Sequence, residues 1–312
     1  WGTGSGQVAA LERGERLRQP GGLGHPVGRQ ARVRSLPRLA AQREGMSDEK
    51  ELHRATIGPV TGYADALFDL TDRVVLVTGG SRGLGKEMAF AAAQCGADVI
   101  IASRKLELCE ATAAEIASAT GRAAMPYQVH VGRGDELAGL VEAAYERFGK
   151  VDVLINNAGM SPLYESLGSV TEKLFDAVVN LNLKGPFRLS TLVGERMVAD
   201  GGGSIVNVSS SGSLRPDAHM LPYAAAKAGL NVLTEGFAKA FGPTVRVNTL
   251  MAGPFLTDVS KAWSFGDGNP FAHFPLQRAG DPPEIVGAAL FLMSNASSFT
   301  TGSILRVDGG LP

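Results

Sequence analysis

Hydrophobic and polar positions follow two alternating patterns from about residue 70 onward. Short, nearly continuous apolar runs such as Asp98–Ser103 are typical of strands that are covered on both faces of a parallel sheet. Longer segments with helical spacing separate these runs. The predicted strands are Arg73–Thr78, Asp98–Ser103, Ala124–His130, Val151–Asn156, Ser204–Ser209, Val245–Leu250 and Ser303–Val307. The predicted helices are Lys86–Cys95, Leu106–Ala119, Gly134–Phe148, Thr171–Val198, Tyr223–Phe241 and Pro282–Met293. This alternation predicts an α/β fold with a doubly wound parallel sheet.

The pattern also divides the chain into two parts. We expect residues 69–312 to form one α/β domain, in which the long irregular stretch 255–275 is a lid. Residues 1–48 show neither a helical nor a strand period, and residues 1–45 carry a net charge of +5 from eight arginines and three glutamates. We therefore expect a flexible, basic N-terminal segment without a function of its own; an arm that binds a partner is the alternative.

Composition narrows the class of protein further. The chain has 312 residues, of which 44% are hydrophobic and 20% charged, as in ordinary globular proteins. A net charge of -1 argues against nucleic-acid or membrane-surface binding, and no apolar run reaches about 18 residues, the length of a membrane span. Cys95 and Cys109 suffice for neither a disulfide framework nor a metal site, so we expect a reducing, cytoplasmic location and no bound metal.

A glycine-rich turn is the first chemical signal. The stretch Thr78–Gly85 follows a predicted strand and opens a predicted helix. Gly79 permits a sharp turn, while Gly83 and Gly85 let backbone approach a pyrophosphate and let the helix pack on the strand. Because the start of a helix offers free N–H groups and a positive dipole end, this context predicts dinucleotide binding.

Further motifs occur in a fixed order downstream. They are Asn156–Gly159 (Asn-Asn-Ala-Gly), Asn182 within Val179–Gly185, the serines Ser209–Ser211, the pair Tyr223 and Lys227 (Tyr-x-x-x-Lys), Arg278–Ile285 and Val307–Gly310. Together with the glycine turn, they resemble the motifs of the short-chain dehydrogenase/reductase family over roughly residues 70–310. The resemblance implies a single Rossmann-fold domain and an oxidoreductase activity with a nicotinamide cofactor.

The Tyr223–Lys227 pair has a chemical meaning of its own. Two side chains four residues apart on a helix share one face. A neighbouring ammonium favours the phenolate, so we expect Lys227 to lower the pKa of Tyr223 and make it a proton donor or acceptor near neutral pH.

The resemblance assigns roles to individual residues. It implies that Asn182, Ser210, Tyr223 and Lys227 are catalytic, with Ser210 chosen among three serines because it lies 13 positions before Tyr223. Asn182 would bind a water that links Lys227 to a proton relay. The implied cofactor-binding residues are Gly79, Ser81, Arg82, Gly83, Leu84, Gly85, Ser103, Arg104, Asn157, Ala158, Gly159, Tyr223, Lys227, Gly253 and Thr257.

The end of the second predicted strand indicates which cofactor is bound. An acidic residue there would favour NAD(H), but Ser103 and Arg104 occupy this position, and Arg82 lies in the glycine turn. Two guanidinium groups suit a ribose 2′-phosphate, so we expect NADP(H), with NAD(H) as the alternative.

Some positions depart from the family pattern. His130 stands where the family usually has Asp, and Ala252-Gly253-Pro254 replaces the common Pro-Gly. By position, Gly212, Ser213, His219 and Phe255 are candidates for the substrate pocket, beneath an aromatic-rich lid.

The sequence thus predicts an NADP(H)-dependent enzyme that interconverts a ketone and a secondary alcohol, with Tyr223 as acid and base. A 3-oxoacyl-thioester reductase and a sugar or polyol dehydrogenase are both compatible with it. The alternatives are an NAD-linked alcohol dehydrogenase and a non-catalytic dinucleotide-binding sensor. The family's long helices form subunit contacts, which implies a homotetramer or homodimer acting on a small-molecule carbonyl or alcohol.

Overall fold

The computed structural model describes residues 62–258, 260 and 268–311, and every structural statement below concerns this part of the chain. The N-terminal segment 1–48 and part of the predicted lid, including Trp263 and Phe265, lie outside the described residues.

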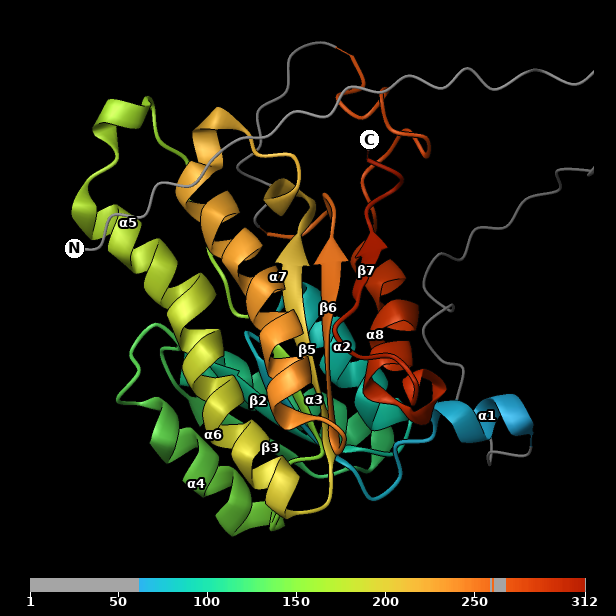
Figure 1. Cartoon of the computed structure of the whole chain (residues 1–312). Coiled ribbons are helices and arrows are strands. Elements are labelled where there is room, and N and C mark those ends of the chain that lie inside the picture. Colours follow the sequence, from blue (N-terminus) through green and yellow to red (C-terminus); the bar gives the residue numbers. More distant parts are fainter. Residues whose placement is uncertain (1–61, 259, 261–267, 312) are drawn as a thin grey trace, which may run out of the picture. The chain divides into compact units, whose positions relative to one another are not determined.

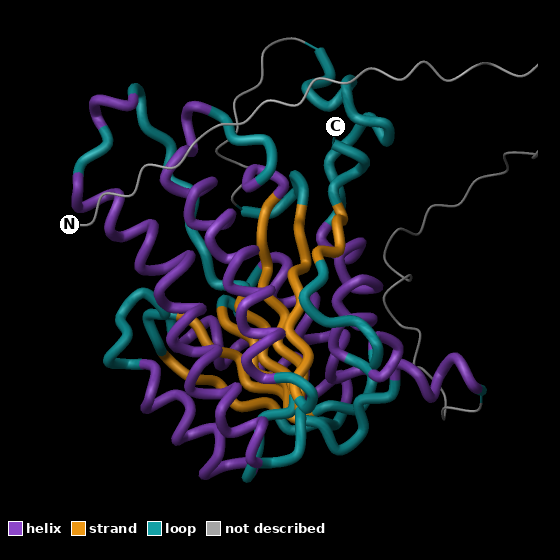
Figure 2. The backbone as a smooth tube through the Cα atoms, viewed as in Figure 1, coloured by secondary structure: helices purple, strands orange, loops and turns teal. Residues whose placement is uncertain are grey.

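A parallel sheet forms the centre of the described domain, as the apolar runs predict (Figures 1 and 2). Its seven strands are arranged in the order β3-β2-β1-β4-β5-β6-β7, and all neighbouring pairs are parallel. The strands are β1 (Val74–Thr78), β2 (Asp98–Ser103), β3 (Ala124–Gln128), β4 (Val153–Asn156), β5 (Gly203–Ser210), β6 (Val245–Ala252) and β7 (Ile304–Val307). The chain order reverses between β1 and β4, which is where open α/β sheets bind ligands, beyond the carboxyl ends of the strands.

Helices cover both faces of the sheet, as expected of a doubly wound fold (Figure 1). They are α1 (Tyr63–Phe68), α2 (Gly83–Gln94), α3 (Leu106–Thr120), α4 (Leu137–Phe148), α5 (Glu172–Val179), α6 (Gly185–Ala199), α7 (Leu221–Phe241) and α8 (Val286–Met293). Val75 and Val77 of β1 pack in one core cluster with α2, α3 and α8. Val74 and Leu76 pack in the other with α4, α6 and α7. Successive side chains of one strand thus enter two cores, which explains the unbroken apolar run.

The predicted elements are all present, with some corrections at their ends. The third strand stops at Gln128, two residues before the predicted end at His130, and α4 starts at Leu137, three residues after Gly134. The predicted helix Thr171–Val198 is interrupted by a π-helical turn, η2 (Asn180–Lys184), between α5 and α6. The segment from Pro282 starts as the 3₁₀ turn η6 (Pro282–Ile285) before α8.

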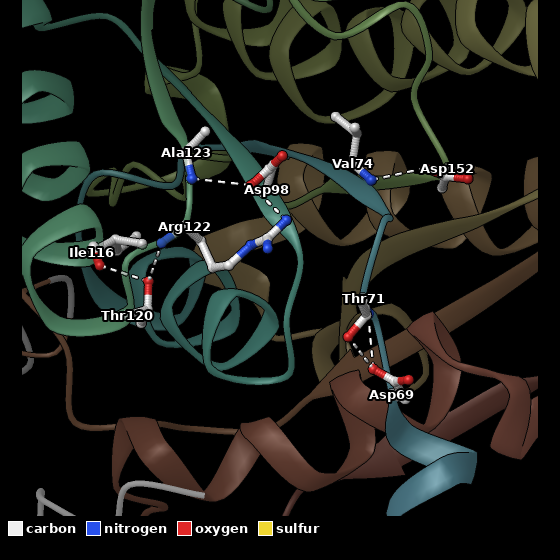
Figure 3. A network of polar contacts seen from close by, with 9 residues as sticks. All are labelled: Asp69, Thr71, Val74, Asp98, Ile116, Thr120, Arg122, Ala123 and Asp152. Atoms are coloured by element: carbon white, nitrogen blue, oxygen red, sulfur yellow. Dashed lines mark hydrogen bonds and ion pairs between the residues drawn. The ribbon is translucent and has the colours of Figure 1, made fainter. Parts of the chain in front are cut away.

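Polar contacts hold the amino ends of β1 and β2, opposite the ligand edge (Figure 3). Asp98 begins β2, and its Oδ1 accepts from the Ala123 backbone at 3.0 Å and pairs with the Arg122 guanidinium at 2.9 Å. Asp152, just before β4, accepts from the backbone N–H of Val74, the first residue of β1, at 2.8 Å. These contacts fix the strand ends, so the carboxyl edge of the sheet can be specialised for binding.

Candidate active site

The glycine turn lies between β1 and α2 and requires glycine at each predicted position. Gly79 and Gly83 have φ values of +65° and +53°, a region that favours glycine. A Cβ at Gly85 would lie 2.3 Å from the Gly79 carbonyl oxygen, so only glycine lets α2 approach the turn this closely. α2 begins at Gly83, within the turn, and its first N–H groups have no partners inside the helix. The turn can therefore accept an anionic group on backbone donors.

The other predicted residues of the turn serve its packing. The carbonyl of buried Ser81 accepts from the Thr112 hydroxyl at 3.2 Å, which anchors the turn to α3. Leu84 packs its side chain against the hydrophobic core around α2. Both contribute to the turn's shape through the core.

The loop that follows β4 holds the glycine turn from the other side. The Thr78 hydroxyl accepts from the backbone N–H groups of Asn157 and Ala158 at 3.0 and 3.1 Å. The Asn157 amide donates to the carbonyls of Thr78 and Gly79 at 3.0 and 3.2 Å. Asn157 and Ala158 thus brace the end of β1. The Thr78 hydroxyl organises this junction, and the sequence prediction did not include it among the site residues.

Asn182 lies in the π-helical turn and is completely buried. Its amide group donates to the carbonyls of Met160 and Val178, both at 2.9 Å, and its Oδ1 accepts from the Met160 N–H at 3.2 Å. A Cβ on Gly159 would lie 2.7 Å from this Oδ1 and 3.6 Å from the Lys227 Nζ. Asn182, Gly159 and Lys227 are therefore brought together as predicted. The side chain of Asn182 is used to hold the loop after β4.

Ser210, Tyr223 and Lys227 meet beyond the carboxyl end of β5. Ser210 ends that strand, and Tyr223 is the third residue of α7. The Ser210 hydroxyl lies near enough to Tyr223 to act on the pKa of its phenol. Lys227 lies one turn further along α7, with its Nζ 5.8 Å from the centre of the Tyr223 ring and 2.7 Å from the Val208 carbonyl, to which it donates. The three predicted groups form one cluster.

Burial controls the ionisation of this cluster. Burial raises the pKa of Tyr223, and the hydrogen bond from Ser210 opposes that rise. The expectation that Lys227 lowers the pKa of Tyr223 is therefore wrong for this structure. Lys227 is only 3% exposed, and burial lowers its pKa from 10.5 to about 8. The Ser210 hydroxyl favours the phenolate, but burial outweighs it.

The residues predicted to select the cofactor lie at the end of β2 and in the glycine turn. Ala102 pairs with Thr78 across the two strands, and its carbonyl accepts from the Gly79 N–H at 2.7 Å. Ser103 and exposed Arg104 therefore lie beside the start of the turn. Arg82 forms an ion pair with Asp258 at 3.6 Å, so its guanidinium is directed toward the segment after β6. That Arg82 and Arg104 bind one phosphate together stays a prediction.

Two predicted residues after β6 have different surroundings. The Gly253 N–H donates to Val307 at 2.9 Å, and a Cβ on Gly253 would lie 2.5 Å from the Asp308 Cα. Gly253 therefore allows the close approach of the chain after β7. A Cβ on Gly83 would lie 3.6 Å from the Thr257 side chain, so Thr257 borders the glycine turn.

Of the four candidate substrate residues, Gly212 lies next to the Ser210–Tyr223–Lys227 cluster, and the others have different surroundings. A Cβ on Gly212 would lie 3.2 Å from the Met220 sulfur and 3.4 Å from the Ser210 hydroxyl, so Gly212 borders the cluster. Ser213, in the short helix η3 (Ser211–Ser213), accepts from the Asn231 amide at 2.9 Å, and His219 is exposed in η4 (Ala218–Met220).

Phe255 is a correction to the prediction. It is 6% exposed and belongs to the core around α2 and α8, and a Cβ on Gly280 would lie 2.7 Å from its ring. An aromatic residue at the start of a loop looks the same in the sequence whether it faces a ligand or the core. In the described part of the predicted lid, Phe274 is also buried and packs edge-on against Phe271.

A small crevice, too narrow to hold a water molecule, lies next to Tyr223. Its lining is mostly apolar and comes from the loop after β4, from α5 and from the start of α7: Pro162, Tyr164, Leu174, Val178, Met220, Pro222 and Tyr223. A larger cavity of about 470 Å³ lies between residues 132–135 and the start of α6, and none of the predicted site residues lines it.

Comparison with known proteins agrees with this geometry. Residues 79–312 match the family model described as Enoyl-(Acyl carrier protein) reductase. A peroxisomal 2,4-dienoyl-CoA reductase of Danio rerio is 36% identical over 77% of this chain and 82% of its own length. A 3-oxoacyl-[acyl-carrier-protein] reductase of Thermotoga maritima is 35% identical over 78% of this chain and 98% of its own.

A solved structure shows the same fold. A 7α-hydroxysteroid dehydrogenase complexed with NADH and 7-oxo glycochenodeoxycholic acid superposes with a TM-score of 0.76 at 32% identity, over 80% of this chain and 98% of that one. The fold and the site thus define an NAD(P)-dependent oxidoreductase that acts on CH–OH or carbonyl groups. The chain belongs to the short-chain dehydrogenase/reductase family.

Proposed function

We propose that this protein is an NADP(H)-dependent oxidoreductase that interconverts a ketone and a secondary alcohol, with Tyr223 as the acid and base. The observation that carries the proposal is the cluster in which Tyr223 lies beside Ser210 and is flanked by Lys227, beyond the end of β5. In the direction of reduction, the Tyr223 hydroxyl donates a proton to the substrate oxygen; in oxidation, the phenolate accepts it. The Ser210 hydroxyl donates a hydrogen bond to the same oxygen and stabilises the charge that develops there.

The residues fit a dinucleotide. Gly79 and Gly83 turn the backbone at positive φ, and the start of α2 would supply N–H donors for a pyrophosphate. Thr257 borders this turn, and buried Lys227 is placed for a ribose hydroxyl near Tyr223. When bound, the nicotinamide supplies the hydride chemistry, and the protein orients the substrate carbon against it.

Two features favour NADP(H) over NAD(H). β2 ends in Ser103, so no carboxylate stands there to accept the ribose hydroxyls or repel a 2′-phosphate. Arg104 follows and is exposed at this edge of the sheet. An arginine in this position suits a phosphate through charge-assisted hydrogen bonds. Arg82 would contribute after releasing Asp258, a weak surface pair with both side chains about half exposed.

The lining of the site favours a substrate with an apolar chain. The narrow crevice beside Tyr223 has a mostly apolar lining and would have to widen to admit a substrate. Leu163 in the loop after β4, Leu214 just after η3 and Leu221 at the start of α7 are 60%, 45% and 38% exposed, respectively. Burying such leucines against an acyl chain would contribute about 25 cal/mol per Å² of apolar surface, whereas a polyol would leave them wet. We therefore favour a 3-oxoacyl thioester over a sugar or polyol as the substrate.

We infer a cytoplasmic location and a homo-oligomeric assembly for this enzyme. Cys95 and Cys109 are both free thiols, as a reducing compartment requires. None of the helices in the described ranges has the length and hydrophobicity that a membrane span needs.

Turnover of a carbonyl panel tests the function. Acetoacetyl-CoA, dihydroxyacetone and 5-ketogluconate are each assayed with NADPH and NADH, for the parent and for Tyr223→Phe. We expect the highest kcat/KM for acetoacetyl-CoA with NADPH, and a loss of about a hundredfold or more in Tyr223→Phe with cofactor binding retained. Near-normal turnover by Tyr223→Phe would contradict the mechanism. A parent that binds NADPH but reduces no carbonyl would instead indicate a dinucleotide sensor.

A further inference from the structure

The hydroxyl of Tyr164 connects two distant segments beside the site. Tyr164 is half-buried in the loop between β4 and α5. Its Oη donates to the Ala218 carbonyl in η4 at 2.7 Å and accepts from the backbone N–H of Leu221 at 2.9 Å. Leu221 is the first residue of α7, 57 positions further along the chain. One phenol therefore joins the loop after β4 to the helix that carries Tyr223 and Lys227.

The bond to Leu221 supplies a cap that α7 otherwise lacks. The first N–H groups of a helix have no partners within it and are usually satisfied by the side chain of the N-cap residue. The N-cap of α7 is Met220, which makes no such bond. Tyr164 accepts from one of these N–H groups instead, in the same first turn that contains Tyr223.

The loop that carries Tyr164 is itself fixed on the opposite side. Asn182 binds both the N–H and the carbonyl of Met160, four residues before Tyr164. The short segment from Met160 to Tyr164 is thus held at the π-helical turn and in turn holds the start of α7. Tyr164 and Tyr223 also line the same small crevice.

We propose that Tyr164 is a positioning residue, which holds the first turn of α7 so that the Tyr223 hydroxyl stays beside the Ser210 hydroxyl. The proposal rests on the function proposed above, in which Tyr223 transfers the proton. Tyr164 itself acts through α7 and needs no contact with the substrate oxygen.

A consequence for ionisation follows from this arrangement. The Ser210 hydrogen bond lowers the pKa of Tyr223 against the effect of burial. If the first turn of α7 loosens, that bond weakens and the pKa of Tyr223 rises. Alcohol oxidation requires the phenolate, so its rate increases as the pH rises through this pKa. Loss of the Tyr164 hydroxyl therefore moves the midpoint of the oxidation profile to higher pH.

The test compares Tyr164→Phe with the parent, using the panel ketone that is turned over fastest and its alcohol. We expect kcat to fall on the order of tenfold, from the loss of two hydrogen bonds that hold the first turn of α7. The affinity for NADPH, measured by fluorescence titration, stays within about twofold because the glycine turn is untouched. The midpoint of the oxidation profile moves to higher pH.

Tyr145→Phe is the matched control. It also removes one phenol hydroxyl, which binds Asp200 at 2.9 Å between α4 and the end of α6, away from the cluster. It should leave kcat and the pH midpoint unchanged. Should Tyr164→Phe fail to fold, Tyr164→Trp replaces it, since indole donates but cannot accept from Leu221 and so should show the same loss.

An unchanged kcat and an unchanged pH midpoint in Tyr164→Phe would overturn the proposal. So would a loss of kcat that leaves the midpoint in place and only parallels a loss of thermal stability. Failure of the underlying function has a different signature, because it would appear as normal turnover by Tyr223→Phe.

Discussion

At the scale of single residues, burial decides the chemistry of the site more than neighbouring charge does. Tyr223 and Lys227 share a helix face, yet burial raises the pKa of the first and lowers that of the second to about 8. Each shift disfavours the charged form. The Ser210 hydroxyl opposes the rise in the Tyr223 pKa but does not outweigh burial.

Cofactor selection is also a property of single residues. Ser103 ends β2 next to the glycine turn, and Arg104 follows it. A carboxylate at position 103 would repel a 2′-phosphate and accept the ribose hydroxyls. Hydrogen bonds to charged groups contribute roughly 1.5–3 kcal/mol each. Ser103→Asp combined with Arg104→Ala should therefore shift the ratio of kcat/KM for NADPH over NADH by about tenfold or more toward NADH.

Steady-state kinetics with both cofactors at matched salt measure this shift. Arg147→Ala, which removes an exposed guanidinium at the end of α4, is the control and should leave the ratio unchanged. If the parent already prefers NADH, then Arg104 does not bind a phosphate and the NAD-linked alternative is correct.

At the scale of elements, one loop organises the site. The segment after β4 holds the glycine turn through Asn157 and Ala158, is held by Asn182 at Met160, and holds the start of α7 through Tyr164. The elements that carry the predicted cofactor and catalytic residues are thus connected by about eight consecutive residues. A disturbance at the glycine turn is therefore expected to affect the turn and this loop together.

The contact between α2 and the glycine turn offers a test of this connection. A Cβ in Gly85→Ala would lie 2.3 Å from the Gly79 carbonyl oxygen and 2.5 Å from the Asn157 amide nitrogen. Because the first of these is backbone, the turn must open. We expect NADPH affinity to fall at least tenfold and the free energy of unfolding to fall by about 1–3 kcal/mol.

Fluorescence titration and thermal unfolding measure the two effects. Gly287→Ala in α8 is the matched control, since a Cβ there would meet no atom within 4 Å, and it should leave both quantities nearly unchanged. A Gly85→Ala variant with parental NADPH affinity would show that the close packing at this turn is not needed for binding.

At the scale of the whole molecule, the sequence predicts the parallel sheet and the helices that cover it. The continuous apolar runs identify strands of a parallel sheet. The glycine turn and the Tyr223–Lys227 spacing are short patterns that can be recognised directly in the sequence. Contacts between distant segments leave no such pattern: Tyr164 with Leu221, Arg82 with Asp258, and Phe255 with Gly280. The pKa of Tyr223 was misjudged for a related reason, because spacing shows a neighbour but not the depth at which both are buried.

The outer face of α6 and α7 exposes apolar side chains to solvent in the single chain. The two helices pack side by side (Figure 1), and Phe187 and Val232 on them are 46% and 72% exposed in the single chain. Exposed apolar side chains on long helices favour contact with a second copy, which buries them. We expect the parent to be a homodimer or homotetramer at micromolar concentration in analytical ultracentrifugation. Val232→Asp should shift it toward smaller species, because an unpaired carboxylate would be buried in the contact. Leu108→Asp on α3, which covers the opposite face of the sheet and has a 38% exposed leucine, should leave the assembly unchanged. A monomeric parent would refute the assembly itself, and an oligomer that Val232→Asp does not weaken would place the contact on another surface.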